Sequence, residues 1–498
     1  MSLHSSARWL PRHAALCFVV LPLLLACALL GSRAAAQFTN PGSSDPQRPN
    51  RRSLLKLATQ FSWDEMANFT GPVDVPVGPG GGWLYLSGYA LRLVPSVPGS
   101  TDPIAQLILY PPNSGHPTLA EDVLIQFPLG PAPAGGWPVL IGFHPYNVSH
   151  ASLILNTQFP QLCAQKGYVL ISPYGMSQYN FANPTAQNAL DKTLELIRQW
   201  IPLDPTRIYT VGFSMGSLNA VSWAMRHLDP SDLRVAGVIV HTGTQDVIEE
   251  YNTAPAAIKN QLAEVFGGTP LTVPFAYDRV NPLRMLAGAA DPDQTNVTNL
   301  LHVPFYVNVN LGDPNVKLVT QTNALANFLI SKGALVNFQA ANFGPTHSWN
   351  TLNFSAALDW IDNFTLPADP QSVELWSDDI GQWLQTEVRA QDAQKVARYK
   401  LAPSGSNALA LTATRFLGEL AFDARDFGAS YRSLLKLDTS SADGTSDTLV
   451  LTGYPSAPSS VALSGGGAVQ SWSYSAALQE LRVIPHPSGS PVQVLITP

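Results

Sequence analysis

A five-residue motif, GFSMG at positions 212–216, constrains the fold of this chain more than any other stretch. The apolar run 208–211 precedes the motif, and apolar residues recur on one helical face of the segment 215–228 that follows it. A serine between two glycines at a strand-to-helix turn is typical of a nucleophile elbow, whose strained backbone holds the hydroxyl exposed above the edge of a sheet. The motif therefore predicts a strand, a sharp turn and a helix, with Ser214 as a nucleophile. A tight turn capped by a serine is the alternative.

Strands and helices alternate on both sides of this motif. Apolar runs between turns that contain Pro or Gly predict buried strands, and segments with one apolar face predict helices. The expected strands are 106–110, 123–127, 138–143, 168–172, 208–211, 238–241, 304–310 and 335–340, and the expected helices are 190–201, 215–228, 319–331 and 349–364. Because strands that alternate with helices form βαβ units, we expect an α/β fold with a mostly parallel, doubly wound sheet.

The same pattern suggests how the chain is divided into domains. The α/β domain is expected over residues 104–366, with an insertion at about 246–301 where the alternation lapses. Short β-prone runs between Gly, Ser and Pro turns predict an all-β sandwich domain at 385–498. The expected domains and connections are a signal peptide at 1–36, a Pro- and Gly-rich lead-in at 37–103, the α/β domain, a linker at 367–384 and the β-sandwich.

The N-terminus resembles a secretory signal, because basic residues precede an apolar run and three alanines come before Gln37. We therefore expect a protein that is exported to the periplasm or the extracellular space. A lipoprotein anchored at Cys27 and an uncleaved membrane anchor are the alternatives. Only Cys163 lies beyond residue 36, so no disulfide is expected within the mature chain.

Composition excludes several classes of protein. Only 13% of the residues are charged, about half of the usual share, and 45% are hydrophobic, which is too apolar for a disordered chain. Three of the 28 basic residues and none of the 35 acidic ones fall in the expected signal peptide, so the remainder has a net charge of −10. This charge predicts no nucleic-acid surface and no attraction to acidic polymers. No stretch after the signal is long and apolar enough to span a membrane.

A serine hydroxyl becomes a good nucleophile only when a base removes its proton and an acid orients that base. His347 follows the expected strand 335–340, and Asp313 directly follows the strand 304–310, which gives the chain order serine, acid, histidine. We expect Ser214, Asp313 and His347 to form a triad. The other candidates for the acid are Asp246, Asp291 and Asp293.

Two backbone amides are expected to hold the oxyanion that forms when the serine attacks. The first belongs to Met215 at the start of the helix, and the second to Tyr146, because Pro145 before it has no amide hydrogen. Tyr174 and Trp349 are candidates for aromatic walls of a substrate cleft, although ordinary buried aromatic residues are an equal alternative. No cofactor is expected, and no metal, since His144 and His150 lack a third ligand nearby.

Several of these stretches together resemble the α/β-hydrolase superfamily, and within it secreted esterases related to polyhydroxybutyrate depolymerases and to feruloyl and acetylxylan esterases. The resemblance covers about residues 104–366 and rests on WPVLIGFH at 137–144, DPTRIY at 204–209, GFSMG, Gly312-Asp313 and His347. It implies the same triad. The chain departs from the family at Pro145 and at Ser217, where glycine is usual. Tyr146 and Met215 also resemble the oxyanion pair of cutinase-like polyester hydrolases, and residues 385–498 resemble β-sandwich modules appended to secreted hydrolases.

Together these features predict a secreted serine carboxylesterase whose substrate is a carboxylic ester, including polymeric ones such as a polyester or an esterified polysaccharide. A prolyl-oligopeptidase-like serine peptidase is one alternative, but such peptidases resemble a long propeller followed by the hydrolase domain, and here only residues 37–103 precede it. An inactive hydrolase fold that serves as a binding protein is the other alternative.

Overall fold

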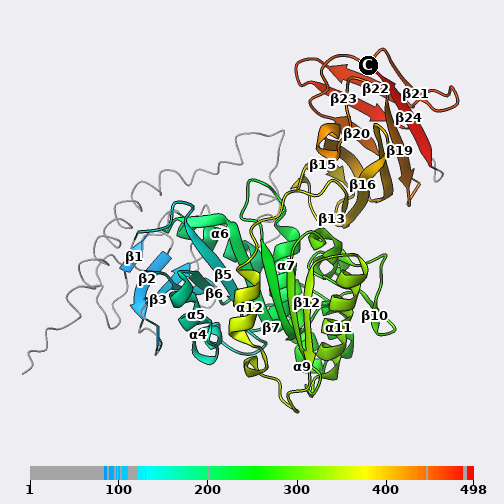
Figure 1. Ribbon diagram of the computed structural model, residues 1–498. Helices are drawn as coiled ribbons and strands as arrows, with labels where there is room; N and C mark the ends of the chain where they lie inside the picture. The colour runs from blue at the N-terminus through cyan, green and yellow to red at the C-terminus, as the bar shows by residue number, and fades with distance from the viewer. Residues whose placement is uncertain are drawn as a thin grey trace, which may run out of the picture.

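The computed structural model (Figure 1) describes residues 84–86, 89–94, 97, 99–100, 102, 104–109, 121–128, 131–198, 201–444, 447–485 and 491–498. The expected signal peptide and most of the expected lead-in lie outside these residues. No helix in the described ranges has both the length and the apolar character needed to cross a bilayer.

A ten-stranded mixed sheet forms the centre of the N-terminal part. Its strand order is β1-β2-β3-β4-β6-β5-β7-β8-β11-β12, and the six strands from β6 to β12 are parallel to one another, whereas β1 to β4 pair antiparallel. The strands are β1 (Leu84–Leu86), β2 (Tyr89–Val94), β3 (Ile104–Leu109), β4 (Glu121–Gln126), β5 (Trp137–Phe143), β6 (Val169–Pro173), β7 (Leu203–Ser214), β8 (Gly237–Gly243), β11 (Phe305–Asn310) and β12 (Val336–Ala341). The sheet thus begins before residue 104, because β2, which lies within the range expected to be a lead-in, pairs with β3.

Helices cover both faces of this sheet, so the sheet is doubly wound as predicted. On β7, Ile208 joins one buried cluster, whereas Tyr209 and Val211 join the cluster on the opposite face. One face is covered by α6 (Pro184–Ile197), α7 (Met215–Arg226) and α11 (Val316–Ser331), and the other by α4 (Ala151–Asn156), α5 (Phe159–Lys166) and α12 (Phe354–Ile361). Two apolar layers therefore enclose the parallel strands.

All four expected helices have somewhat different bounds in the structure, and the differences are largest for two of them. Asn183 caps α6 by accepting a hydrogen bond from the amide of Ala186 at 3.0 Å, and a proline follows it, so this helix begins before residue 190. The expected helix 349–364 is split: Trp349–Thr351 form a 3₁₀ turn, η3, and Asn353 then caps α12. Capping residues decided both boundaries.

The chain between β8 and β11 forms the insertion that the lapse in alternation predicted. It contains α8 (Val247–Thr253), α9 (Ala256–Phe266), α10 (Pro274–Asp278), a hairpin of β9 (Met285–Leu286) and β10 (Ala289–Ala290), and the 3₁₀ helix η2 (Asn296–Leu300). Leu262 and Phe266 of α9 pack in one buried cluster with Met215 and Leu218 of α7. The insertion therefore packs directly against the helix that follows the GFSMG motif.

Two six-stranded sheets form the C-terminal β domain. Their orders are β13-β16-β17-β19-β24-β21 and β14-β15-β18-β20-β23-β22, and all pairs are antiparallel except β17 with β19 and β18 with β20. The strands are β13 (Val373–Ser377), β14 (Gly381–Trp383), β15 (Thr386–Gln391), β16 (Ala397–Gly405), β17 (Ala408–Arg415), β18 (Leu417–Phe422), β19 (Leu435–Ser441), β20 (Thr448–Leu451), β21 (Ser460–Leu463), β22 (Ser471–Ser475), β23 (Glu480–Ile484) and β24 (Val492–Thr497). Buried residues of both sheets belong to one apolar cluster, which makes the two sheets a packed pair.

The expected linker 367–384 is not a simple connection. Two strands within it, β13 and β14, pair with β16 and β15 respectively, so the β domain begins earlier than residue 385. Val373 and Leu375 are buried on either side of the half-buried Glu374, and Trp376 and Ser377 after them are buried as well. The prolines around residues 367–370 had suggested a longer break.

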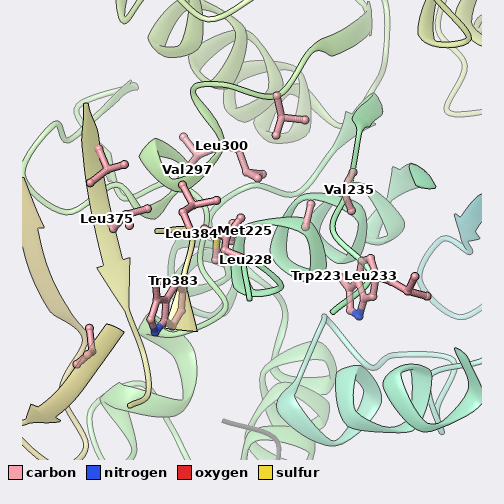
Figure 2. Close-up of a cluster of buried hydrophobic side chains, with 14 of the residues drawn as sticks. Trp223, Met225, Leu228, Leu233, Val235, Val297, Leu300, Leu375, Trp383 and Leu384 are labelled. Carbon is pink, nitrogen blue, oxygen red and sulfur yellow. The ribbon is translucent and has the colours of Figure 1, made fainter. Parts of the chain in front are cut away.

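The two parts of the molecule share a continuous core. Figure 2 shows Leu375, Trp383 and Leu384 of the β domain beside Met225 and Leu228 of the α/β part, and all five are buried. The amide of Leu384 also donates a hydrogen bond to the carbonyl oxygen of Leu228 at 3.0 Å. The β domain is therefore packed onto the end of α7 and not merely tethered to it.

A buried ion pair lies at the same junction. The carboxylate of Asp378, which follows β13, accepts hydrogen bonds from Nε of Arg226 at 2.9 Å and from Nε of Arg279 at 2.8 Å. All three side chains are nearly inaccessible to solvent. One acidic residue of the β domain therefore binds one arginine of α7 and one arginine of the insertion.

Candidate active site

The GFSMG motif forms the sharp turn that the sequence predicts. Ser214 ends β7 with φ 57° and ψ −123°, a conformation that is strained for any residue other than glycine, and α7 begins at Met215. A Cβ at Gly212 would lie 1.9 Å from the carbonyl oxygen of Gly216, and a Cβ at Gly216 would lie 2.1 Å from that of Phe143. Both glycines are required because strand, turn and helix approach within backbone contact.

Ser214, His347 and Asp313 form a continuous chain of hydrogen bonds. Nε2 of His347 lies 2.8 Å from Oγ of Ser214, and Nδ1 of His347 lies 2.6 Å from Oδ2 of Asp313. A carboxylate can only accept, so Nδ1 carries the proton and Nε2 is free to accept one from the serine hydroxyl. The Asp313 side chain is 1% exposed and that of His347 is 23% exposed, so the acid is sealed and the base can reach solvent.

Secondary structure brings these three residues to one edge of the sheet. Ser214 ends β7, Asp313 follows β11, and His347 lies in the loop after β12, so all three stand at the carboxyl ends of parallel strands. The amide of Asn315 donates to Oδ1 of Asp313 at 2.8 Å, which leaves Oδ2 for the imidazole. The ring of Phe213 lies 4.4 Å from that of His347, centroid to centroid, and limits its movement.

The loop after β5 lies beside the start of α7. The close approach of Gly216 to the carbonyl groups of Phe143 and His144 shows this directly. The amide of Met215 has no acceptor within its own helix, because it is at the first position. The amide of Tyr146 donates to no other residue in the described part of the chain. Both amides are therefore available to an oxygen at Ser214.

The Tyr146 side chain contacts the insertion. Its hydroxyl donates a hydrogen bond to Oε1 of Gln261 on α9, and its ring lies 5.7 Å from that of Phe181. Burial raises the pKa of this hydroxyl, so it remains a donor at neutral pH. The contact joins the oxyanion loop to the insertion, a link that sequence could not reveal because Gln261 is one of many polar residues on an amphipathic helix.

Buried side chains hold the neighbouring loop. Nε2 of His144 lies 2.9 Å from the carbonyl oxygen of Tyr174, and burial lowers the pKa of His144, which keeps its ring neutral. The Glu121 carboxyl accepts the amides of Gly175 at 2.9 Å and Met176 at 2.6 Å. Burial raises the pKa of Glu121 to about 8.

Trp349 and Tyr174, the two aromatic residues considered as walls of a cleft, pack against neighbouring rings. Trp349 is 4% exposed and packs under the loop of His347 against Phe213, so it is a core residue. The ring of Tyr174 is packed between two histidine rings: its centroid lies 5.7 Å from that of His144 and 5.5 Å from that of His150. Packing thus favours the alternative of ordinary buried aromatics for Trp349, and Tyr174 anchors the loops around the site.

The rival acids lie in other environments. Asp246 caps α8, accepting the amides of Ile248 and Glu249, and its second oxygen accepts the amide of Met285. Asp293 is exposed and lies 3.4 Å from Arg398. The structure therefore pairs Asp313, and none of these rivals, with His347.

His241 takes a position that the sequence did not reveal. It is fully buried on β8, with Nε2 3.0 Å from the carbonyl oxygen of Ser348 and Nδ1 3.0 Å from Nδ2 of Asn308. Since the Asn308 amide nitrogen donates, Nδ1 accepts and Nε2 carries the proton. Burial lowers the pKa of His241 to about 4, so it is neutral. The sequence placed His241 at the end of the strand after the motif, but it gave no sign of the contacts with Ser348 and Asn308.

No group of His, Cys, Asp and Glu side chains able to hold a metal is present among the described residues. His144 and His150 instead bind a backbone carbonyl and Asp122 respectively. Cys163 is a buried free thiol, and burial raises its pKa strongly.

No family model and no curated protein matches the chain. One similar solved structure is an S-formylglutathione hydrolase from Agrobacterium tumefaciens, with 12% sequence identity and a TM-score of 0.41; the match covers 54% of this chain and 98% of that one. Another is an acetyl xylan esterase from Paenibacillus sp. R4, with 11% sequence identity and a TM-score of 0.38; the match covers 64% of this chain and 97% of that one. A ferulic acid esterase has 14% identity over 52% of this chain and 97% of its own, with a TM-score of 0.38. Likeness of this extent bears on neither activity nor substrate. The strand order, the turn at Ser214 and the helices on both faces themselves show an α/β-hydrolase-like fold with an appended β domain.

Proposed function

We propose that the protein is a serine carboxylesterase, and the observation that supports this most is the hydrogen-bonded chain Ser214–His347–Asp313. In the proposed reaction Oγ of Ser214 attacks the ester carbonyl carbon while Nε2 of His347 accepts the hydroxyl proton. His347 then delivers that proton to the departing alcohol, which leaves an acyl group on Ser214. Water attacks the acyl group with the same base, releases the acid and restores the serine.

The other parts of the site support the same reaction. Asp313 orients the imidazole and stabilises its positive charge after proton transfer. The amides of Met215 and Tyr146 are proposed to donate to the oxyanion of the tetrahedral intermediate. The neutral ring of His144 fixes the loop after β5 to the loop after β6, which holds the Tyr146 amide in place.

The experiment compares the mature protein with Ser214→Ala on p-nitrophenyl esters of short and medium acyl length. We expect the variant to lose at least about 10⁴-fold in kcat while its melting temperature stays close to that of the parent. Equal rates for the two proteins would refute the mechanism. Cleavage of peptide substrates without ester hydrolysis would favour the peptidase alternative, and binding without turnover would favour an inactive hydrolase fold.

We also propose that the substrate is a neutral carboxylic ester, including esters of a polyester or polysaccharide chain, and that the protein is exported. Residues 1–36 support export by their sequence pattern alone. N-terminal sequencing of the processed protein should begin at Gln37. A mature N-terminus at Cys27 carrying lipid would instead establish the lipoprotein alternative.

A further inference from the structure

A groove lies at the junction of the insertion and the β domain, away from the triad. Its cavity volume is about 180 Å³, and none of its lining residues belongs to the Ser214 site. Phe275 and Arg284 of the insertion face Trp376 and Arg415 of the β domain across it. The groove is thus built by two parts of the chain that are distant in sequence.

The charges of this junction groove are unbalanced. Its lining contains three basic residues, Arg284, Lys395 and Arg415, and one acid, Asp278. Within the described residues, none of the three cations forms an ion pair with a carboxylate. The local charge is therefore positive, although the sequence beyond the expected signal peptide is acidic.

A neighbouring arginine, Arg398, lies opposite Arg415 in the sheet. Arg415 is the register partner of Arg398 on the adjacent strand, and like charges directly opposite each other destabilise a sheet. Arg398 is paired with Glu374 at 2.6 Å and with Asp293 at 3.4 Å, whereas Arg415 lies against the ring of Phe416, 6.0 Å from its centroid. Lys395 lies 5.5 Å from the same ring. An anion bound here would offset the repulsion that the fold leaves in place.

Trp376 supplies a second and independent sign of a ligand. It is 7% exposed and lines the groove, yet its indole Nε1 has no hydrogen-bond partner in the described structure. A buried donor without an acceptor costs about 1–3 kcal/mol. The guanidinium of Arg398 lies over the indole ring, 4.9 Å from its centroid, and Asn299 binds the backbone of Trp376 at 2.7 and 3.0 Å, so both the ring and its backbone are held in place. A ligand oxygen in the groove would satisfy this donor.

We propose that the junction groove binds a carboxylate-bearing sugar unit of a polysaccharide. The three cations fit the carboxylate, while the indole N–H and the Gln294 and Gln394 amides fit hydroxyl groups. Pockets for drug-sized ligands are roughly 300–1,000 Å³, so this smaller cavity holds a single unit. Because Lys395, Arg415 and Gln394 at its rim are exposed, the rest of a chain can extend beyond it. This proposal does not depend on ester hydrolysis.

Isothermal titration calorimetry of the full mature protein tests this directly, with trigalacturonate, the neutral xylotriose and inorganic phosphate as the three probes. We expect heat of binding with trigalacturonate that weakens as salt is raised, and none with xylotriose. The double variant Lys395→Gln/Arg415→Gln should bind trigalacturonate at least about tenfold more weakly. Trp376→Phe, which keeps an aromatic side chain but lacks the indole N–H, should bind it about 3- to 10-fold more weakly.

Arg432→Gln is the matched control, because Arg432 is an exposed arginine of the same domain outside the groove. It should bind trigalacturonate as the parent does. Phosphate binding without trigalacturonate binding, no binding of either anion, or equal affinity of parent and double variant would each overturn the proposal. Hydrolysis of p-nitrophenyl acetate by the variants should equal that of the parent, and an inactive parent would refute the proposed esterase while leaving the binding result intact.

Discussion

His241 holds the backbone next to His347: its Nε2–H donates to the carbonyl oxygen of Ser348, the residue that follows His347, at 3.0 Å. The ring of Phe213 is stacked on that of His241 at 4.8 Å and lies beside that of His347 at 4.4 Å. The histidine on β8 is thus a positioning residue for the loop of the base. Its ring nitrogens contact Ser348, Asn308 and Thr351, and not Ser214.

Replacing His241 should therefore impair catalysis through geometry. We expect His241→Phe to lower kcat on p-nitrophenyl acetate by about 10- to 100-fold, because small displacements of a catalytic group cost rates of this order. His241→Gln, which retains a donor, should recover part of the loss. If both variants keep the parental kcat while only their melting temperatures fall, the residue has a structural role alone.

The same residue should make stability depend on pH. Burial lowers the pKa of His241 from 6.5 to about 4 in the folded chain, so between these values the unfolded chain binds more protons. The contribution of His241 is fully present above pH 6.5 and is lost as the pH falls toward 4. Urea unfolding at several pH values should show a steeper fall for the parent than for His241→Gln over this window. Parallel curves would contradict the assignment.

Replacing Asp313 and replacing Asp246 should have different effects on kcat. Asp313→Asn should lower kcat by about 10⁴-fold, because the amide stabilises the wrong imidazole tautomer. Asp246→Ala should change kcat little and instead cost about 0.5–2 kcal/mol of unfolding free energy through the lost cap of α8. Steady-state kinetics and urea unfolding of both variants test this. A large loss of kcat in Asp246→Ala alone would transfer the role of the acid.

Gly216, the second residue of α7, should not tolerate a side chain. A Cβ at Gly216 would lie 2.1 Å from the Phe143 carbonyl oxygen, so Gly216→Ala must displace either the oxyanion loop or the elbow. We expect loss of esterase activity and at least about 1–3 kcal/mol of stability. Gly405→Ala is the matched control, since its nearest neighbour would lie at 3.7 Å. An active Gly216→Ala would mean that the turn is less crowded than the structure shows.

Asp378 should contribute strongly to the stability of the junction between the two domains. Asp378→Ala leaves Arg226 and Arg279 buried without their shared carboxylate, which should cost about 3–5 kcal/mol. The control is Asp359→Ala, which removes an exposed partner of Lys166 and should cost less than about 1 kcal/mol. Both values come from urea unfolding monitored by tryptophan fluorescence. Equal effects would show that the junction pair contributes no more than a surface pair.

Local patterns were sufficient for much of the fold and of the triad. The apolar run before the GFSMG motif, the positions of Asp313 and His347 after strands, and Pro145 without its amide are all short-range signals. Parallel strands then bring their carboxyl ends to one edge of the sheet, so the three residues meet without further information. The β domain was likewise visible as short alternating runs.

Contacts between distant residues could not be predicted in this way. The pairing of Asp378 with Arg226, the bond from Tyr146 to Gln261 and the groove at Trp376 each join parts of the chain that have no common local pattern. Trp349 was open to two interpretations because its burial depends on Phe159 and Phe213. The linker expected at 367–384 contains two strands, β13 and β14. The sequence did not show them because they are stabilised by strands further along the chain.

The shared core has a consequence for how the protein is made. Met225 and Leu228 are covered by Leu384, which the ribosome adds about 160 residues later. At about 5–20 residues per second, the end of α7 stays uncovered for about 10–30 s of synthesis. During that interval α7 presents an apolar C-terminal end to any factor that binds nascent chains. The core of the α/β part is thus completed only after the β domain has been translated.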